Sequence, residues 1–414
     1  MRIVLSLLFL CAAIVVLRAG DLSLVGTTDK DQALYKAGET IVFTITPMQD
    51  GKPVDGKKLT WTRTGDDGKT EKGAAVSSAA TPLTITTSMA SPGFVRIEVE
   101  ALDDQGKPVV DAQNKPVRFD GGAGVDIERL QSIPEPPDFD AFWARQKAKL
   151  AAVPMKFTMT EVPSKDPHFS VYDVKIDCAG GKPVSGYLAK PKGAAPKSKA
   201  AMVTFAGYGV SSAQPFPLFS SITFAINAHG IENGKDPAFY QALMNGELKG
   251  YALDSKDYEK PEDAYLNGML LRVMRALEFI KAQPEWNGKD LTAQGGSQGG
   301  YQSIAAAALD KDVTKCSAFV PWFCDLGGVT VGRLPSGLRP AWVPGLGYYD
   351  AANLGKRIHC PTALTTGLGD YTCPPSGVTV LYNNLTVPKT LTYTQGATHS
   401  FKPTNPRQFM ISGP

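Results

Sequence analysis

The segment Gly295-Gly296-Ser297-Gln298-Gly299-Gly300 restricts the possible folds of this sequence more than any other feature. It fits the pattern Gly-x-Ser-x-Gly and lies between a short apolar run, Leu291 to Ala293, and a helix-forming run, Ala305 to Leu309. Small residues around a serine let the chain turn sharply from a strand into a helix, so that the hydroxyl projects above the end of a sheet. The segment therefore predicts a strand, a tight turn at Ser297 and a helix.

The chain around this segment alternates between strand-like and helix-like runs from about Ala200 onward. Such alternation is typical of βαβ units and a mostly parallel sheet. The run from Ala201 to Phe205 is mostly apolar, as expected for a strand that is buried on both faces. Further predicted elements are a helix with the apolar stripe Met269, Val273, Leu277 and Ile280, and strands at Cys316 to Val320 and Thr362 to Thr366. Together with the serine turn, this order predicts an α/β-hydrolase fold.

The earlier part of the chain has a different pattern, in which short strand-like runs alternate with polar turns. A chain of 414 residues is longer than one hydrophobic core usually supports, so two domains are expected. The strand-like runs are Thr40 to Pro47, Leu59 to Thr64, Pro82 to Ser88 and Phe94 to Ala101. Apolar and polar residues alternate along them, which predicts an all-β, immunoglobulin-like sandwich.

A proline-rich linker, Ile133 to Pro137, separates the two patterns, and Asp138 then opens an amphipathic helix. We predict a sandwich domain over residues 21–122 and an α/β-hydrolase domain over residues 123–414. Because the β-type pattern ends near Gly121 and the helix-rich pattern begins only after Asp138, the first domain is expected to be a separable module.

Residues 1–20 predict a cleaved signal peptide and therefore an exported protein, either periplasmic or secreted. Arg2 precedes an apolar run from Ile3 to Leu17, and the small residues Ala19 and Gly20 precede the polar Asp21. The alternative is a membrane anchor, but this run is shorter than the roughly 20 apolar residues that span a bilayer. No stable membrane anchor is therefore expected after cleavage.

Charge and cysteine content argue against a nucleic-acid-binding protein and against a cysteine-based zinc site. The formal net charge is +3, and the 43 Lys and Arg residues are interspersed with 40 Asp and Glu residues, so no nucleic-acid partner is predicted. The cysteines beyond the leader are Cys178, Cys316, Cys324, Cys360 and Cys373. Their spacing matches no zinc pattern, and at most two disulfides can form.

A serine hydroxyl is a poor nucleophile near neutral pH, so it needs a histidine base and a carboxylate that orients the histidine. In the α/β-hydrolase order the acid follows the serine and the histidine comes last. The chain has four histidines, His168, His229, His359 and His399. The first two precede Ser297, and His359 comes just before a predicted strand, at the wrong edge of the sheet. His399 is therefore the predicted base.

The predicted acid is Asp370, which follows the expected strand Thr362 to Thr366 across Gly367-Leu368-Gly369. This position is a loop at the carboxyl end of a strand, the edge where open α/β sheets carry their functional groups. Asp325 and Asp350 are the rival candidates, and either could instead be a loop residue or a helix cap.

An oxyanion hole needs two backbone N–H groups, one of which follows the nucleophile, here at Gln298. The second is expected from the loop after an earlier strand. The segment Phe205-Ala206-Gly207-Tyr208-Gly209 is that loop, and the Tyr208 N–H is the candidate.

The chain resembles the acetyl xylan esterase and cephalosporin C deacetylase family of carbohydrate esterases over roughly Pro136 to His399. The resemblance rests on five motifs: Pro137-Asp138-Phe139-Asp140-Ala141-Phe142-Trp143, Gly207-Tyr208, Lys249-Gly250-Tyr251, Gly-Gly-Ser297-Gln-Gly-Gly and Gly369-Asp370-Tyr371-Thr372-Cys373-Pro374-Pro375-Ser376. It implies a substrate that is an acetylated oligo- or polysaccharide or a small acetyl ester, and hydrolysis without a metal or cofactor.

The chain departs from the family pattern in two places. The family usually has Arg-Gly-Gln-Gly where this chain has Ala228 to Ile231, and Glu after the catalytic histidine where this chain has Ser400. The first domain is also additional to the compact members, so the oligomeric state stays open. Two other functions remain possible: a carboxylesterase or peptidase of the same fold, and a non-catalytic carbohydrate-binding protein.

Overall fold

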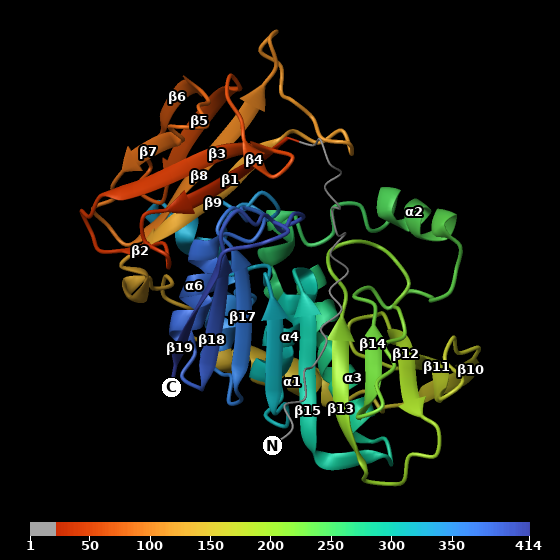
Figure 1. Ribbon diagram of the computed structural model, residues 1–414. Coiled ribbons are helices and arrows are strands. Elements are labelled where there is room, and N and C mark those ends of the chain that lie inside the picture. The colour runs from red at the N-terminus through yellow and green to blue at the C-terminus, as the bar shows by residue number, and fades with distance from the viewer. Residues whose placement is uncertain (1–21) are drawn as a thin grey trace.

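The computed structural model describes residues 22–414, and the predicted signal peptide lies outside this range. Figure 1 shows a smaller β-rich domain above a large sheet with helices. The strands of the smaller domain are β1 (Ser23–Thr28), β2 (Leu34–Tyr35), β3 (Ile41–Gln49), β4 (Lys52–Pro53), β5 (Lys58–Gly65), β6 (Glu71–Val76), β7 (Leu83–Thr87), β8 (Gly93–Leu102) and β9 (Arg118–Val125). In the described chain they form two sheets, one of order β1-β3-β4 with β7 paired to β3, and one of order β2-β9-β8-β5-β6.

The larger domain is built on one sheet of mixed direction. Its strands are β10 (Phe157–Val162), β11 (Phe169–Ile176), β12 (Val184–Pro191), β13 (Lys199–Phe205), β14 (Ser221–Ile226), β15 (Trp286–Gly296), β16 (Lys315–Phe319), β17 (Thr362–Gly367), β18 (Lys389–Thr394) and β19 (Gln408–Gly413). Their order in the sheet is β10-β11-β12-β14-β13-β15-β16-β17-β18-β19. The strands from β14 to β18 are parallel, whereas β10 to β12 and β19 pair in antiparallel fashion. The predicted mostly parallel α/β sheet is therefore present.

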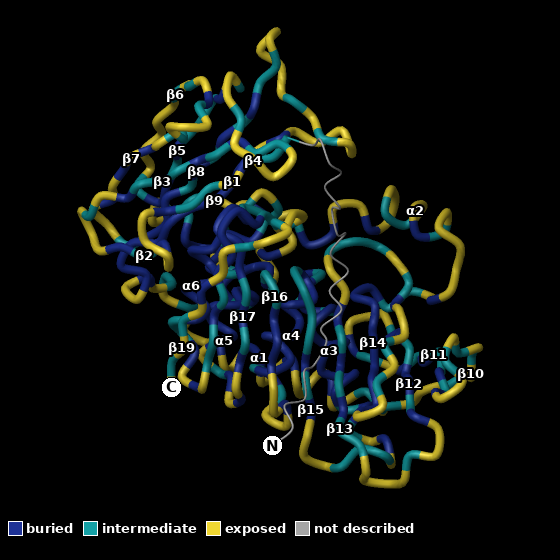
Figure 2. Tube along the Cα trace, in the orientation of Figure 1, coloured by how far each residue is buried: buried dark blue, intermediate teal, exposed yellow. Residues whose placement is uncertain are grey.

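Helices pack against this sheet, and α2 lies apart from them (Figure 1). The helices of the described chain are α1 (Phe139–Ala151), α2 (Pro237–Asn245), α3 (Tyr265–Lys281), α4 (Gln298–Leu309), α5 (Ala351–Gly355) and α6 (Pro375–Asn384). Helices α1, α3, α4, α5 and α6 each pack on the next, and α3, α4 and α6 contact the strands. The predicted apolar stripe of α3 is buried, and so is most of the rest of that helix, as Figure 2 shows for the interior of the domain.

Two expectations from the sequence are wrong in detail. In β13, Ala201, Val203 and Phe205 are buried, but Met202 and Thr204 are partly exposed, so this strand is not buried on both faces. The predicted domain boundary after Gly122 falls inside β9, which continues to Val125 as a strand of the first domain. The immunoglobulin-like arrangement of that domain stays a prediction.

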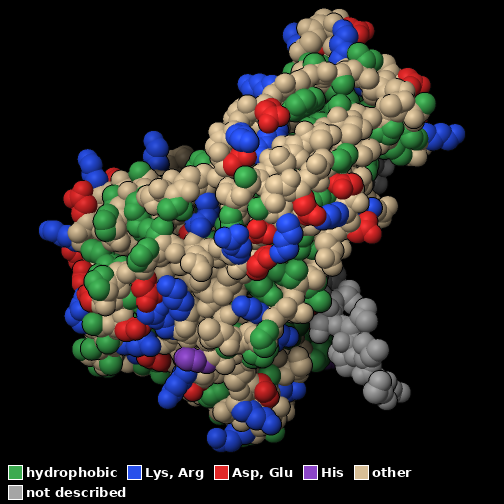
Figure 3. All heavy atoms as spheres, turned by 90° about the vertical axis from the view of Figure 1, so that its left-hand side faces the viewer, with side chains coloured by type: hydrophobic (Ala, Val, Ile, Leu, Met, Phe, Trp, Pro, Cys, Tyr) green, Lys and Arg blue, Asp and Glu red, His purple; other side chains and the backbone are tan. Residues whose placement is uncertain are grey.

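The surface of the described chain carries mixed charge. On the face that Figure 3 shows, Lys and Arg side chains lie among Asp and Glu side chains. Within residues 22–414, no helix has the length and apolar character needed to cross a membrane. All the cysteines in this range are free thiols.

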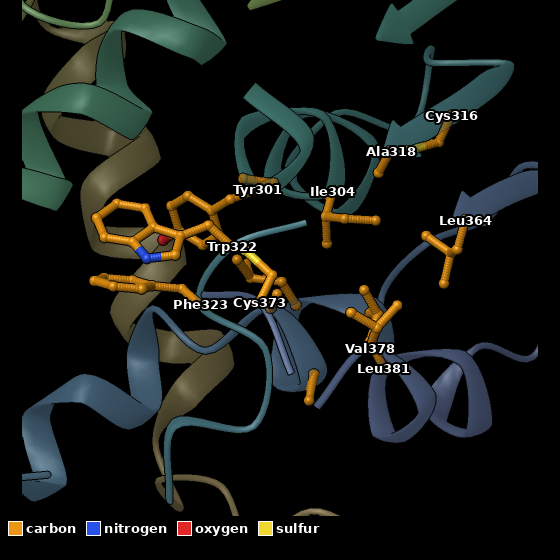
Figure 4. Packing of buried hydrophobic residues seen from close by; sticks show 14 of the residues in the cluster. Tyr301, Ile304, Cys316, Ala318, Trp322, Phe323, Leu364, Cys373, Val378 and Leu381 are labelled. Carbon is orange, nitrogen blue, oxygen red and sulfur yellow. The ribbon is translucent and has the colours of Figure 1, made fainter. Parts of the chain in front are cut away.

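The turn between β15 and α4 brings backbone segments very close together. Ser297 has φ 56° and ψ −120°, a left-handed φ that is uncommon for a residue with a side chain. A Cβ atom on Gly299 would lie 2.2 Å from the Phe205 carbonyl oxygen, which belongs to β13. Behind the turn, Tyr301, Trp322 and Phe323 pack together at the start of α4 (Figure 4). Glycine at position 299 is thus required by the approach of α4 to the sheet.

We predict that Gly299→Ala is poorly tolerated and that Gly296→Ala is tolerated. The nearest atoms to a Cβ on Gly299 belong to the backbone, which cannot move aside cheaply, whereas a Cβ on Gly296 would have its first neighbour at 3.8 Å. Overpacking of this kind costs about 3 kcal/mol, which lowers the Tm by about 5 °C or more. Thermal unfolding monitored by circular dichroism tests this. Equal Tm values for the two variants would contradict it.

Candidate active site

Ser297 lies in the turn between β15 and α4, at the carboxyl end of β15 and partly open to solvent. Its own backbone is fixed on both sides. The Ser297 N–H donates to the Phe319 carbonyl oxygen at 2.8 Å, and its carbonyl oxygen accepts from the N–H groups of Tyr301 and Trp322, both at 3.0 Å. The strained backbone is therefore held by the neighbouring strand and by helix α4, which keeps the hydroxyl in one position.

His399 lies between the serine and Asp370. Its Nε2 is 3.0 Å from the Ser297 Oγ, and its Nδ1 is 2.9 Å from Oδ2 of Asp370. A carboxylate can only accept, so Nδ1 carries the proton and Nε2 is free to accept from the hydroxyl. His399 is 27% exposed, which leaves the serine side of the ring accessible. The structure thus brings the three predicted residues together in the order that proton transfer requires.

Asp370 is completely buried, at 0% exposure, in the loop after β17. Its second oxygen, Oδ1, accepts from the backbone N–H groups of Thr372 at 3.0 Å and Cys373 at 2.8 Å. These bonds compensate the carboxylate for its loss of water and fix its orientation. The loop therefore presents Oδ2 to His399 in a fixed direction.

The rival acids have other partners. The Asp350 carboxylate accepts from the backbone N–H groups of Asp325, Leu326 and Ala352, and burial raises its pKa to about 7. Asp325 forms an ion pair with Arg333. Both carboxylates thus bind the loop around Asp325 and the start of helix α5, and within residues 22–414 neither is hydrogen-bonded to a histidine.

The other histidines lie away from Ser297. His359 is exposed just before β17, at the opposite edge of the sheet, and His168 is exposed just before β11. His229 is buried and holds two partners of its own: its Nε2 contacts the Gly209 carbonyl oxygen at 2.9 Å, and its Nδ1 contacts the Tyr265 hydroxyl at 2.6 Å. His399 is the histidine that contacts Ser297.

The two predicted oxyanion donors lie on the segments expected for them. Gln298 is the first residue of α4, where the N–H groups of the first turn have no partner within the helix. Tyr208 lies in the loop after β13, and its ring stacks on Tyr251 with centroids 4.3 Å apart.

Tyr251 links these two segments, a role that the sequence did not reveal. Its hydroxyl accepts from the Gly209 N–H at 2.8 Å and donates to Oε1 of Gln298 at 2.8 Å. Its ring meanwhile stacks on Tyr208. One buried side chain therefore fixes the loop after β13 relative to the start of α4. The only signal in the sequence was the motif Lys249-Gly250-Tyr251, which does not indicate what the tyrosine contacts.

Cys373 is a second residue near the site that sequence reasoning did not single out. Its sulfur, the Asp370 carboxylate and a His399 ring nitrogen lie within 4.8 Å of one another, the one such group of potential metal ligands among the described residues. Burial raises the pKa of the Cys373 thiol well above its usual value, so it is a neutral thiol there. Asp370 and His399 are hydrogen-bonded to each other, and a metal ion in this place would compete with that hydrogen bond.

The comparison with known families identifies the chain. A family model described as acetyl xylan esterase (AXE1) matches residues 128–333 and 341–409, which together form more than half of the sequence. The chain belongs to the acetyl xylan esterase family. The match includes Ser297, Asp370 and His399 and begins just after the first domain.

Individual relatives of this family agree with the match. The acetyl esterase Axe7A of Xylanibacter ruminicola is 30% identical over 277 residues, which span 61% of this chain and 61% of Axe7A. The acetyl xylan esterase from Paenibacillus sp. R4 has 23% identity and a TM-score of 0.54, and covers 66% of this chain and 93% of that protein. Acetyl xylan esterase 1 from Thermoanaerobacterium sp. JW/SL YS485 has 21% identity and a TM-score of 0.52, with 67% and 93% covered. These two structures show the fold of the larger domain.

At one departure from the acetyl xylan esterase pattern, the structure places a buried histidine with two hydrogen-bond partners. In the segment Ala228 to Ile231, the family's usual Arg-Gly-Gln-Gly is absent, and His229 instead holds the carbonyl oxygen of Gly209. Because a carbonyl only accepts, the neutral ring is protonated on Nε2, and Nδ1 accepts from the Tyr265 hydroxyl. Ser400, where the family usually has Glu, is exposed.

We predict that His229 makes the protein less stable as the pH falls. Burial lowers the pKa of His229 to about 4, below the value of about 6.5 expected in an unfolded chain. Between these values the unfolded chain binds a proton that the folded protein does not, so stability falls as the pH drops from about 6.5 to about 4. Above this window the imidazole is neutral in both states, so it adds nothing to the pH dependence of stability.

His229→Gln removes this titration. The free energy of unfolding of the wild type should fall by about 3 kcal/mol more than that of the variant between about pH 7.5 and about pH 4, measured by urea titration at each pH. The subtraction cancels the carboxylates, which titrate in both proteins. Parallel curves for the two proteins would show that the ring is not held neutral.

Proposed function

We propose that this chain is a serine esterase that hydrolyses acetyl, or similarly small acyl, esters of carbohydrates through an acyl-enzyme. Ser297 is the nucleophile, His399 the general base and Asp370 the acid that orients the base. The observation that carries the proposal is the position of His399, whose two ring nitrogens lie 3.0 Å from the Ser297 Oγ and 2.9 Å from the Asp370 Oδ2. Membership of the acetyl xylan esterase family supports the same reaction.

In the first step, Ser297 Oγ attacks the ester carbonyl carbon while its proton passes to Nε2 of His399. The Asp370 carboxylate stabilises the imidazolium that forms. The N–H groups of Gln298 and Tyr208 donate to the developing oxyanion, in the region that Tyr251 holds together. The tetrahedral intermediate then collapses, and the sugar alcohol leaves with the proton that His399 returns.

In the second step, water replaces the alcohol. His399 takes a proton from the water as it attacks the acyl-serine, and the carboxylic acid leaves as Ser297 recovers its proton. Each bond that forms or breaks is accounted for by these residues and water. The chemistry itself therefore needs no cofactor.

The relatives and the sequence support a proposal for the substrate and for the cellular location. Axe7A is named an acetyl esterase and the two structural relatives are named acetyl xylan esterases, which favours acetylated oligo- or polysaccharides here. The leader-like residues 1–20 favour export to the periplasm or medium. The first domain is proposed to be an immunoglobulin-like sandwich.

The competing functions make different substrate predictions. A small-acyl esterase should cleave acetyl esters faster than butyryl esters, show little activity on octanoyl esters and leave peptide anilides intact. It should also release acetate from acetylated xylan or from small acetylated sugars. A preference for octanoyl esters or peptide anilides would support another hydrolase, and binding to polysaccharides without any turnover would support a carbohydrate-binding protein.

Single substitutions in the proposed triad should abolish activity without unfolding the protein. Ser297→Ala, His399→Ala and Asp370→Asn should each lower kcat by ~10⁴ or more, because the three residues act as one unit. For the same reason, the double variant Ser297→Ala with His399→Ala should lose little beyond either single variant.

His359→Ala is the matched control, since His359 is an exposed histidine at the other edge of the sheet. It should retain the wild-type kcat. Circular dichroism establishes that each variant is folded. Substantial activity in His399→Ala would mean that another residue is the base, and the roles proposed for Ser297 and Asp370 would then fail as well.

A further inference from the structure

Strand β9 of the first domain lies directly against the loops that carry Asp370 and His399. In Figure 1 it is the strand of that domain nearest the ends of β17 and β18. Its segment Asp120-Gly121-Gly122-Ala123-Gly124 is buried throughout. A Cβ on Gly122 would lie 3.1 Å from the Leu368 carbonyl oxygen, and one on Gly121 would lie 2.3 Å from Oε1 of Gln395. These glycines therefore permit a close approach between the two domains.

Gln395 joins β9 to the loop of His399. It is the first residue after β18, is 4% exposed, and lies 273 positions from Gly122 in the sequence. Its Oε1 accepts from the Gly122 N–H at 3.0 Å, and its Nε2 donates to the Gly122 carbonyl oxygen at 2.8 Å. The side chain thus pairs with β9 as another strand would. The segment that follows it leads directly to His399.

Asp120 and Arg96 meet the loop of Asp370 from the same side. The Arg96 guanidinium binds the Asp120 carboxylate through two hydrogen bonds, of 2.9 and 2.6 Å, and lies 4.3 Å from the centre of the Tyr371 ring. Asp120 is 3% exposed, and a Cβ on Gly369 would lie 2.1 Å from its carbonyl oxygen. The residues before and after Asp370 therefore both pack on the first domain.

The two loops are also tied to each other. The Gly369 N–H donates to the Ala397 carbonyl oxygen at 3.0 Å, so a shift of either loop moves its neighbour. A third contact fixes the adjoining segment, because Asp66 of the first domain accepts from the Leu334 N–H at 2.8 Å. These contacts converge on the segments around Asp370 and His399.

We propose that the first domain forms part of the active-site framework, with Gln395, Arg96 and Asp120 as positioning residues for His399 and Asp370. This inference rests on the proposed function. Gln395 sets where the His399 loop leaves the sheet, and the Arg96–Asp120 pair supports the loop of Asp370 through Tyr371 and Gly369. The separable module that the sequence predicts does not fit these contacts.

The test compares two variants that lose equivalent hydrogen bonds. Gln395→Ala removes an acceptor and a donor that pair with the backbone of β9. Ser77→Ala is the matched control: the Ser77 Oγ accepts from the Lys57 N–H at 2.9 Å and donates to the Val54 carbonyl oxygen at 2.8 Å. Ser77 is also buried but follows β6, the strand at the far edge of the sheet that contains β9.

Gln395→Ala should lower kcat by about tenfold or more with KM within about threefold, because a small misplacement of a reacting group is costly. The acid limb of the pH profile of kcat/KM should move to lower pH, since a looser contact with Asp370 stabilises the His399 imidazolium less. Ser77→Ala should keep the wild-type kcat and acid limb even if its Tm falls as far. A folded Gln395→Ala with wild-type kcat and acid limb, or a parallel loss in both variants, would overturn the inference.

Arg96→Lys provides a second test if Gln395→Ala does not fold. It keeps a positive charge beside Asp120 but loses the paired geometry and the stacking on Tyr371. It should show the same fall in kcat at nearly constant KM, and an unchanged kcat would contradict the role of Arg96. Activity retained by Ser297→Ala would instead refute the proposed function itself, so the two failures are distinguishable.

Discussion

The two hydrogen bonds of the His399 ring are the interaction on which the proposed chemistry depends, and they require three separate segments to meet at one edge of the large sheet. Ser297 comes from the turn after β15, Asp370 from the loop after β17 and His399 from the loop after β18. Parallel pairing of β15 to β18 brings these strand ends to the same edge. The glycine at position 299 lets α4 begin close enough to β13 for the serine turn to form.

Ordering such loops costs conformational entropy and buries polar groups that need hydrogen-bond partners. In this structure, side chains supply these partners by binding backbone groups. Tyr251 bonds the Gly209 N–H and the Gln298 side chain, Asp370 accepts two backbone N–H groups, and Gln395 satisfies both polar groups of Gly122. Gly122 belongs to the first domain, so we infer that this domain helps to position the catalytic residues.

The sequence predicted the features that are local in the chain. The serine turn has its own pattern, His399 was selected from four histidines by chain order, and Asp370 by its place after a strand. Contacts between distant segments could not be predicted in this way, because no local pattern encodes the pairing of Gln395 with Gly122 or of Tyr251 with Gln298. The end of the first domain was predicted near Gly121, where the alternating β-type pattern stops, because the glycine-rich end of β9 has no such alternation although it is a strand that another backbone approaches closely. The misjudged burial of β13 has a similar origin, because Ala201 and Met202 are both apolar although only Ala201 is buried.

The most direct test of the account is to trap the acyl-enzyme. The protein is mixed with an activated acetyl ester, quenched in acid during turnover, digested and examined by mass spectrometry. We expect one acetyl group on the peptide that contains Ser297, a burst of alcohol release equivalent to one acetyl group per active site, and neither signal in Ser297→Ala. Acetyl transfer to a different residue, or full turnover by Ser297→Ala, would contradict the assignment of Ser297 as the nucleophile.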